Sequence, residues 1–286
     1  MGGAAGLGAT ASNALAKLAN VTFAAADPRQ LAEFWAAALG YELQEAPPDF
    51  MEAWLAEGRD PNGAAAAVDP AGVGTRLFFN KRQKTPTIEV PIHLDVNVLD
   101  PDAEIERLLG LGARLVTRKT VTIGEFSEGW TVMRDPEGNG FCVQGPDRRA
   151  EEGPFVRNIT FSCADPQRLA DFWAQALGYS RQEGDDELLQ QLLDTGLDPA
   201  EIDAEVALVH PEAGRRSRLY FQRRQKTPTT EIPVHVDLTA EDREAEVERL
   251  TALGASVVET TTRTTGPYEE VWTVMRDPEG NGFCVQ

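Results

Sequence analysis

Histidine and aspartate recur together twice in this 286-residue chain, as His93 with Asp95 and as His235 with Asp237. Each pair is separated by one position within alternating apolar residues, so a β-strand would point both side chains to the same face. An imidazole titrating near neutral pH can transfer protons or bind a metal ion. The aspartate either adds an anionic group to that site or has a structural role, such as holding the imidazole in one tautomer or capping a turn.

The segment WTVMRDPEGNGFCVQ occurs twice without change, at residues 130–144 and 272–286. Its ends favour strands, and its centre, DPEGNG, is dense in turn-forming residues, so we predict a tight hairpin. Alternation along the second strand puts Cys142 and Gln144 on one face, opposite an apolar face. Gln144 and its repeat Gln286 therefore become candidate ligand contacts.

The three cysteines do not form a disulfide framework. Cys142 and Cys284 are repeat-equivalent, whereas Cys163 corresponds to Ala25 in the first half. An odd number with this spacing is untypical of paired cysteines. We interpret them as small buried side chains rather than catalytic thiols, because no histidine or other base adjoins them in the sequence.

The elements that position these residues are predicted twice over. Residues 20–24 alternate as a strand, Asp27 and the proline after it begin a helix, and Gly40 ends that helix. The same pattern restarts at Asn158. The aromatic residues of each helix lie at core spacing and are interpreted as core, not as a cofactor site. Each half is predicted as strand, helix and three strands, followed by the same succession again.

The segment that differs most between the halves precedes the third predicted strand. Residues 49–57 and 185–193 are both predicted to form amphipathic helices, and Asp198 with Pro199 caps a further turn in the second half. Insertions of this kind commonly become lids or pocket walls. A difference in ligand between the halves would originate here.

The amino-acid composition limits which binding partners and which cellular location are expected. The net charge of -19 disfavours nucleic acid and anionic membrane surfaces. No apolar run approaches the roughly 20 residues that span a bilayer, and no export signal is recognisable at the start, so we expect a cytoplasmic protein. We predict a mobile tail at residues 1–18 and a polar linker at 146–153.

Several motifs resemble those of the glyoxalase, bleomycin-resistance and extradiol-dioxygenase superfamily, also called vicinal oxygen chelate proteins, and of its glyoxalase-like subgroup. They are ADPxxLAxFWAxALGY, RLFF followed by PIHLDV, the helix end ALGA, and RDPEGNGFCVQ. The resemblance covers the chain after about Leu18, twice. It implies an α+β fold of two tandem glyoxalase-like domains, at residues 19–145 and 154–286. Each would contain two βαβββ units with curled mixed sheets around a cleft and helices outside, giving one cleft per half.

Metal-dependent members of this superfamily take histidine, glutamine and glutamate ligands from the first and last strands of each unit. Carried over residue by residue, the resemblance implies Asn20, Asn80 or Phe78, His93 and Gln144 in the first half, and Asn158, Gln222 or Tyr220, His235 and Gln286 in the second. Only the histidines match cleanly, and amide oxygens are weaker ligands than carboxylates. We predict no cofactor; a divalent metal, if bound, would use His93 with Gln144 and His235 with Gln286.

Two functions remain open. The first is a protein, monomeric or homodimeric, that binds a small aromatic or hydrophobic metabolite or drug without a catalytic metal. The second is a divalent-metal-dependent lyase, isomerase or dioxygenase acting on a small oxygenated metabolite, with His93 and His235 as catalytic residues. The predicted ligand-binding residues are Asn20, Phe78, Asn80, His93, Asp95, Trp130, Gln144, Asn158, Tyr220, Gln222, His235, Asp237, Trp272 and Gln286. No nucleophile with its base and no nucleotide fingerprint is present, which favours the first function.

Overall fold

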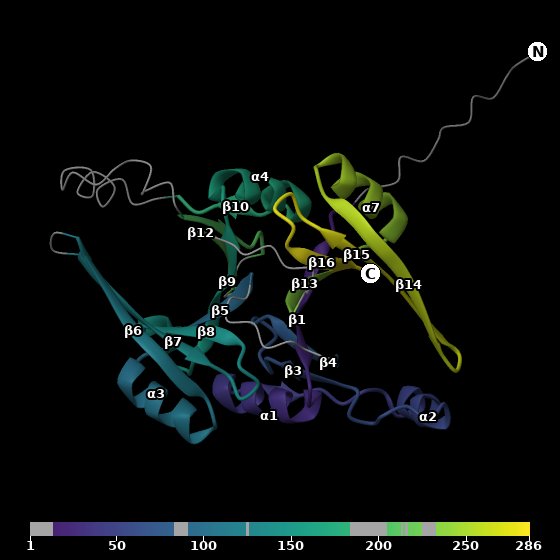
Figure 1. Cartoon of the computed structure of the whole chain (residues 1–286), viewed down its shortest axis with the longest axis horizontal. Coiled ribbons are helices and arrows are strands. Elements are labelled where there is room, and N and C mark those ends of the chain that lie inside the picture. The colour runs from purple at the N-terminus through teal and green to yellow at the C-terminus, as the bar shows by residue number, and fades with distance from the viewer. Residues whose placement is uncertain are drawn as a thin grey trace, which may run out of the picture.

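The computed structural model describes residues 14–82, 91–123, 126–183, 205–212, 214, 217–224 and 233–286 (Figure 1). Within these residues the chain forms two mixed eight-stranded sheets with helices packed against them. The α+β prediction is thereby confirmed. The inserted helix predicted at 185–193, the turn at Asp198 and most of the predicted tail lie outside the described residues.

The elements follow the predicted succession. The first half contains β1 (Lys17–Ala25), α1 (Pro28–Leu39), β2 (Glu42–Leu43), α2 (Pro48–Ala56), β3 (Ala64–Val68), β4 (Arg76–Lys81), β5 (Ile92–Asn97), α3 (Pro101–Gly110), β6 (Arg114–Ile123), β7 (Phe126–Arg134) and β8 (Gly140–Gln144). One turn of 3-10 helix, η1 (Arg148–Ala150), follows. The second half contains β9 (Phe155–Cys163), α4 (Pro166–Leu177), β10 (Ser180–Arg181), β11 (Glu205–Val209), β12 (Arg218–Arg223), β13 (Val234–Thr239), α7 (Arg243–Ala252), β14 (Ser256–Thr265), β15 (Tyr268–Arg276) and β16 (Gly282–Val285).

Helix α1 begins and ends where its sequence signals predict. The Asp27 side chain accepts a hydrogen bond from the backbone N–H of Gln30, which satisfies a donor that the first turn leaves unpaired. Gly40 ends the helix at φ 69°, a left-handed conformation that glycine adopts without steric cost. Helix α4 repeats both devices with Asp165 and Gly178.

Two boundaries differ from the sequence-based prediction. Strand β1 already begins at Lys17, inside the predicted tail, because Ala16 is buried and its N–H donates to the Glu246 carboxylate at 3.3 Å. In the second half the sequence pattern also predicts Thr239 as the start of the helix after PVHVDL, but helix α7 is capped by Asp242, and Thr239 is the last residue of β13. The side chain of Asp242 accepts from a first-turn N–H, as an N-cap requires.

Each sheet is built from both halves of the chain. The strand order is β14-β15-β16-β13-β1-β4-β3-β2 in the first sheet, here sheet A, and β10-β11-β12-β9-β5-β8-β7-β6 in the second, sheet B. Strand β1 pairs antiparallel with β13, and β5 pairs antiparallel with β9. In Figure 1 the purple β1 accordingly lies beside β13. The prediction of one cleft within each half is therefore wrong.

The physical reason lies in the near-identity of the units. The strands PIHLDV and PVHVDL present the same alternation, so β1 would bury the same faces against β5 or against β13. Alternation alone cannot distinguish the two pairings. The observed one brings Thr22 opposite His235 and Asn20 opposite Asp237.

The aromatic core, in contrast, stays within each half. Trp35 of α1 packs on Phe23 of β1 and on Phe141 of β8, with ring centroids 5.8 and 5.2 Å apart. Its indole N–H donates to the buried carboxylate of Asp135 in the β7–β8 turn. Glu137 in the same turn accepts from two backbone N–H groups just before α1. Helix α1 therefore joins the two units of the first half, although their strands belong to different sheets.

Among the described helices, none combines the length and apolar character that a membrane crossing requires.

Candidate functional site

Sheet A carries a cleft whose floor combines residues of both halves; we call it cleft A. The cavity has a volume of about 390 Å³. The sequence-predicted residues that line it are Asn20, Phe78, Asn80, His235, Asp237, Trp272 and Gln286. The first three belong to the first half and the other four to the second. The pairing of β1 with β13 therefore brings these residues together in one cleft.

The centre of the floor is a buried histidine–aspartate pair. His235 Nε2 lies 3.2 Å from Asp237 Oδ1. The other carboxylate oxygen of Asp237 accepts from Thr22 Oγ1 at 2.6 Å and from Asn20 Nδ2 at 3.2 Å. Because Thr22 and Asn20 are on β1, the aspartate of the second half is held by the first.

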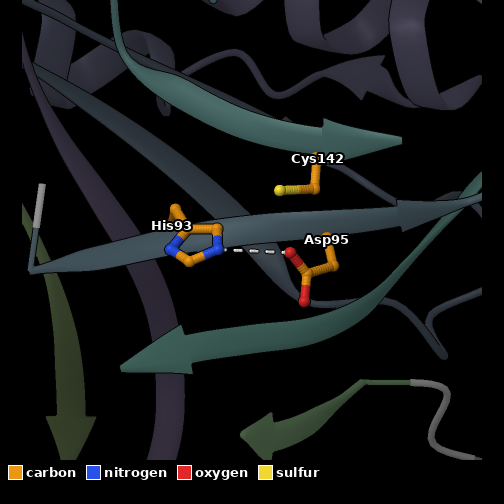
Figure 2. A group of neighbouring side chains, drawn as sticks. All are labelled: His93, Asp95 and Cys142. Atoms are coloured by element: carbon orange, nitrogen blue, oxygen red, sulfur yellow. Dashed lines mark ion pairs between the residues drawn. The ribbon is translucent and has the colours of Figure 1, made fainter. Parts of the chain in front are cut away.

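The equivalent residues of sheet B repeat this arrangement, and we call their site cleft B by analogy. His93 Nε2 lies 3.3 Å from Asp95 Oδ1, and Asp95 Oδ2 accepts from Thr160 and Asn158, both at 2.7 Å. Figure 2 shows the imidazole directed at the carboxylate, with the Cys142 thiol beside them. The strand alternation thus correctly placed each histidine and aspartate on the same side.

Both aspartates are held ionised by their partners. Burial raises the pKa of Asp237, but the hydrogen bonds and charge of His235, together with Thr22 and Asn20, outweigh this effect and lower it. The pKa of Asp95 is lowered for the same reasons. An ionised carboxylate at Nε2 makes this nitrogen a hydrogen-bond donor. The geometry therefore agrees with an aspartate that holds the imidazole in one tautomer.

Two cysteines adjoin these pairs, although the sequence analysis selected neither as a site residue. Ligand atoms of His235, Asp237 and Cys284 all lie within 4.8 Å of one another, as do those of His93, Asp95 and Cys142. The alternation that puts Cys142 on the same face as Gln144 was the available signal, and the parallel pairing of β5 with β8 then brings Cys142 opposite Asp95. Burial raises the pKa of both thiols, and the neighbouring carboxylates add to the effect. At neutral pH they are therefore protonated and weakly nucleophilic.

The divalent metal that the family resemblance implies does not fit the amide set of cleft A. Asn20 is committed at both ends, because its Nδ2 donates to Asp237 and its Oδ1 accepts from Arg76 Nη1 at 2.6 Å. Phe78 offers no ligand atom. A guanidinium bonded to a would-be ligand oxygen repels a second cation, and the Asp237 carboxylate is already engaged. His235, Asn80 and Gln286 would then hold a divalent ion with uncharged ligands alone.

Arg76 is a cleft residue that the sequence analysis did not select. It lies half-buried, its Nε donates to Gln44 Oε1 at 2.7 Å, and its guanidinium carbon lies 5.2 Å from the centroid of the Phe78 ring. The alternation of RLFFN, which puts Arg76, Phe78 and Asn80 on one face, was the available signal. Arg218 occupies the equivalent place in cleft B, where it bonds Asn158 and stacks over Tyr220.

A second cavity of about 440 Å³ adjoins the floor of cleft A, and we call it the outer chamber. Its aromatic and thioether walls come from β4, α2 and β15: Phe78, Phe50, Met51, Trp54 and Tyr268. Four residues line both cavities: Arg76, Phe78, Arg263 and Glu270. Cleft A thus has a polar floor that continues into an apolar chamber.

Helix α2 roofs this chamber by contacting the β14–β15 hairpin of the other half. The Glu57 carboxylate accepts from the Gly266 N–H at 2.9 Å, and Asp49 accepts from the Tyr268 hydroxyl. The Phe50 ring packs edge-on against Tyr268 at 5.5 Å. The inserted helix predicted at 49–57 is therefore a wall of a cavity, as its position indicated.

Cleft B differs from cleft A in charge. Glu205 accepts hydrogen bonds from Tyr220 and Gln222, where the equivalent ladder position in sheet A is Ala64. In sheet B Val121 stands opposite Glu128, whereas in sheet A Arg263 pairs with Glu270 at 2.7 Å. The remaining predicted residues, Trp130 and Gln144, stand opposite each other on β7 and β8. Cleft B therefore carries an additional carboxylate and has a valine at the position of Arg263.

The fold is that of solved glyoxalase structures. Glyoxalase I from Zea mays matches with a TM-score of 0.62 at 14% identity, over 94% of this chain and 92% of that chain. A proposed dioxygenase from Bacillus subtilis matches with a TM-score of 0.54 at 17% identity, over 96% and 86%. At such identities the likeness concerns the fold alone. No curated protein matches the sequence.

The sequence itself matches a family model in both halves. The model described as "Glyoxalase-like domain" matches residues 20–144 and again residues 158–286. These two matches contain all the residues of both clefts described above. The chain therefore belongs to the glyoxalase-like domain family, as a tandem duplication.

Proposed function

We propose that this protein binds a small molecule with an aromatic or hydrophobic body in cleft A, without a catalytic metal. The observation that carries the proposal is the continuity of the polar floor with the aromatic outer chamber through Arg76 and Phe78. Pockets for organic ligands are typically apolar cavities of this size with a few fixed polar groups. The His235–Asp237 pair supplies such groups.

An enzymatic function has weaker support in the described residues. The thiol of Cys284 is protonated, the amide set does not suit a divalent ion, and the carboxylate of Asp237 is occupied by hydrogen bonds. A nucleophile must be ionised or have a base beside it, and a metal ion must find ligand atoms that are not already engaged. Binding requires none of them.

Phe78→Ala tests the proposed function, with Tyr220→Ala in cleft B as the matched control. Hydrophobic aromatic compounds are screened first for thermal stabilisation of the wild-type protein, and each hit is then titrated calorimetrically. We expect Phe78→Ala to weaken binding by about tenfold or more, because an aromatic contact is lost. Tyr220→Ala should leave the affinity unchanged.

Circular dichroism establishes that both variants retain the fold. Hits that bind Phe78→Ala as tightly as the wild type, or that lose affinity only with Tyr220→Ala, would contradict a site in cleft A.

A further inference from the structure

Arg76 is a half-buried cation whose hydrogen-bond partners are all neutral. Its Nε donates to the amide oxygen of Gln44 and its Nη1 to that of Asn20. Among the described residues no carboxylate forms an ion pair with it, and its Nη2 has no hydrogen-bond partner. A guanidinium stays protonated in proteins and offers five N–H donors, so donors remain available.

This lack of a counterion is unexpected in so acidic a chain. The sequence has 46 aspartates and glutamates against 27 lysines and arginines. Arg263, which lines the same two cavities, is paired with Glu270, and Arg29 at the edge of the outer chamber is paired with Glu45. A partly buried charge is costly without an ionic partner. Among the described residues, Arg76 is thus the half-buried arginine of this cleft that has no carboxylate partner, whereas Arg82, which also has none, is exposed to solvent.

The Asp237 carboxylate does not occupy the free N–H donors of Arg76. Burial lowers the pKa of Arg76, and the charge of Asp237 offsets part of this through space. The carboxylate of Asp237, however, contacts His235, Thr22 and Asn20. It therefore stabilises Arg76 at a distance without occupying its donors.

The charges that line the floor of cleft A leave room for one anion. Its cationic residues are Arg76, Arg82 and Arg263, and its carboxylates are Asp237 and Glu270. An organic anion with a single charge would balance this set. Because Arg76 also lines the outer chamber, an anionic group bound to it would direct the rest of the molecule between the aromatic walls.

We propose that cleft A binds an aromatic carboxylic acid, whose carboxylate pairs with Arg76 and whose ring occupies the outer chamber. This rests on the function proposed above and names its ligand class. A carboxylate can accept two parallel N–H bonds from the fork of a guanidinium, which a neutral amide of the same size cannot do. The stacking of Arg76 on Phe78 presents that fork from a fixed position. Cleft B, with Glu205 and without an equivalent of Arg263, is not expected to take the same acid.

Matched acids and neutral analogues test this proposal by calorimetric titration of the full chain. The panel consists of benzoate, phenylacetate, 2-naphthoate and indole-3-acetate, each with its primary amide, and naphthalene-2-sulfonate as a non-planar oxyanion. We expect at least one acid to bind with a stoichiometry of one and to exceed its amide in affinity by about tenfold, the effect of a charge-assisted bidentate pair.

Three variants connect the preference to Arg76. Arg76→Gln should abolish the preference for acid over amide, and Arg76→Lys should retain part of it, because lysine keeps the charge but not the fork. Arg218→Gln, the equivalent change in cleft B, should leave the affinity and the stoichiometry unchanged. Circular dichroism and thermal unfolding report whether each variant folds.

The outcomes distinguish a failure of this proposal from a failure of the proposed binding function. If the amides bind as tightly as the acids and Arg76→Gln has no effect, the proposal of a carboxylic acid is wrong. The proposed binding function would still hold. Tighter binding of naphthalene-2-sulfonate than of 2-naphthoate would also contradict the proposal that the bound anion is a carboxylate. If neither acids nor amides bind below about 1 mM, an affinity of about 4 kcal/mol, both proposals fail.

Discussion

Asp237 and Asp95 each connect a histidine of one half to strand residues of the other. Asp237 is almost fully buried, yet its carboxylate is held by His235, Thr22 and Asn20. A buried charge is tolerated only when it is paired and hydrogen-bonded. These contacts therefore serve two purposes, because they orient the imidazole and couple the two halves.

At the scale of single residues, Asp237→Asn is expected to destabilise the protein near neutral pH by about 1–3 kcal/mol. If the amide oxygen of Asn accepts from Thr22 and Asn20, its NH₂ group must face His235 Nε2. Two hydrogen-bond donors then lie opposite each other. Because the pKa of Asp237 is lowered in the folded state, its contribution is present above the pKa of the unfolded chain and is lost as the pH falls through the folded value.

Urea unfolding between pH 3 and pH 8 measures this effect. The difference in unfolding free energy between wild type and Asp237→Asn should shrink below about pH 4. A difference that is the same at pH 3 and at pH 7 would show that Asp237 does not act as a charge. Asp95→Asn, in cleft B, should behave alike because its contacts are equivalent.

At the scale of elements, the contact between α2 and the β14–β15 hairpin determines whether the outer chamber is closed. The helix belongs to the insertion of the first half and the hairpin to the last unit of the second. Gly266 at the hairpin turn has φ 55°, and a Cβ there would lie 2.8 Å from that of Ala53. Glycine is therefore required by the backbone conformation and by the close approach of the helix.

Gly266→Ala should separate α2 from the hairpin without unfolding the sheets. We expect the amides of residues 48–56 to exchange hydrogen faster by about an order of magnitude, and ligands of the outer chamber to bind more weakly. Gly72→Ala is the matched control, because Gly72 has φ 70° but nothing within 4 Å of its would-be Cβ. Equal exchange rates at residues 48–56 in Gly266→Ala and Gly72→Ala would contradict this role for the hairpin.

At the scale of the whole molecule, each half keeps its own aromatic core while each sheet is shared. Trp35 and Phe141 pack within the first half, and Trp173 and Phe283 pack within the second, with ring centroids 5.2 and 5.3 Å apart. The strands that carry the clefts pair between halves, as β1 with β13 and β5 with β9. Because these aromatic contacts stay within a half and the sheets are shared, we expect the halves to be folding units that these strand pairs hold together.

Residues 1–151 expressed alone should therefore form a homodimer. In it, β1 of one copy would pair with β5 of the other, because PIHLDV has the alternation of PVHVDL in β13. Size-exclusion chromatography with light scattering measures the mass, and addition of residues 152–286 should convert the homodimer to a complex of both halves. A folded monomer of residues 1–151 would show that the pairing across halves is not required.

Much of this architecture was predictable from local patterns. The capping residue Asp27, the terminating Gly40 and the turn DPEGNG determine their elements through interactions within a few residues. Strand alternation likewise assigned His235 and Asp237 to the ligand-facing side, where both line cleft A. Arg76 follows the same alternation and could have been selected as a site residue. Cys284 has no histidine or other base near it in the sequence, so its proximity to His235 and Asp237 could not be predicted.

The sequence by itself determined the repeated units, most of their helix and strand boundaries and which residues share a face of each strand, because these follow from short-range periodicity and capping. Only the tertiary structure decided which units share a sheet, since β5 and β13 offer β1 the same pattern and the choice depends on packing across the whole chain. That choice joins Asn20 and Arg76 to His235 in one cleft. It also brings α2 to the distant hairpin, a contact that no local pattern encodes.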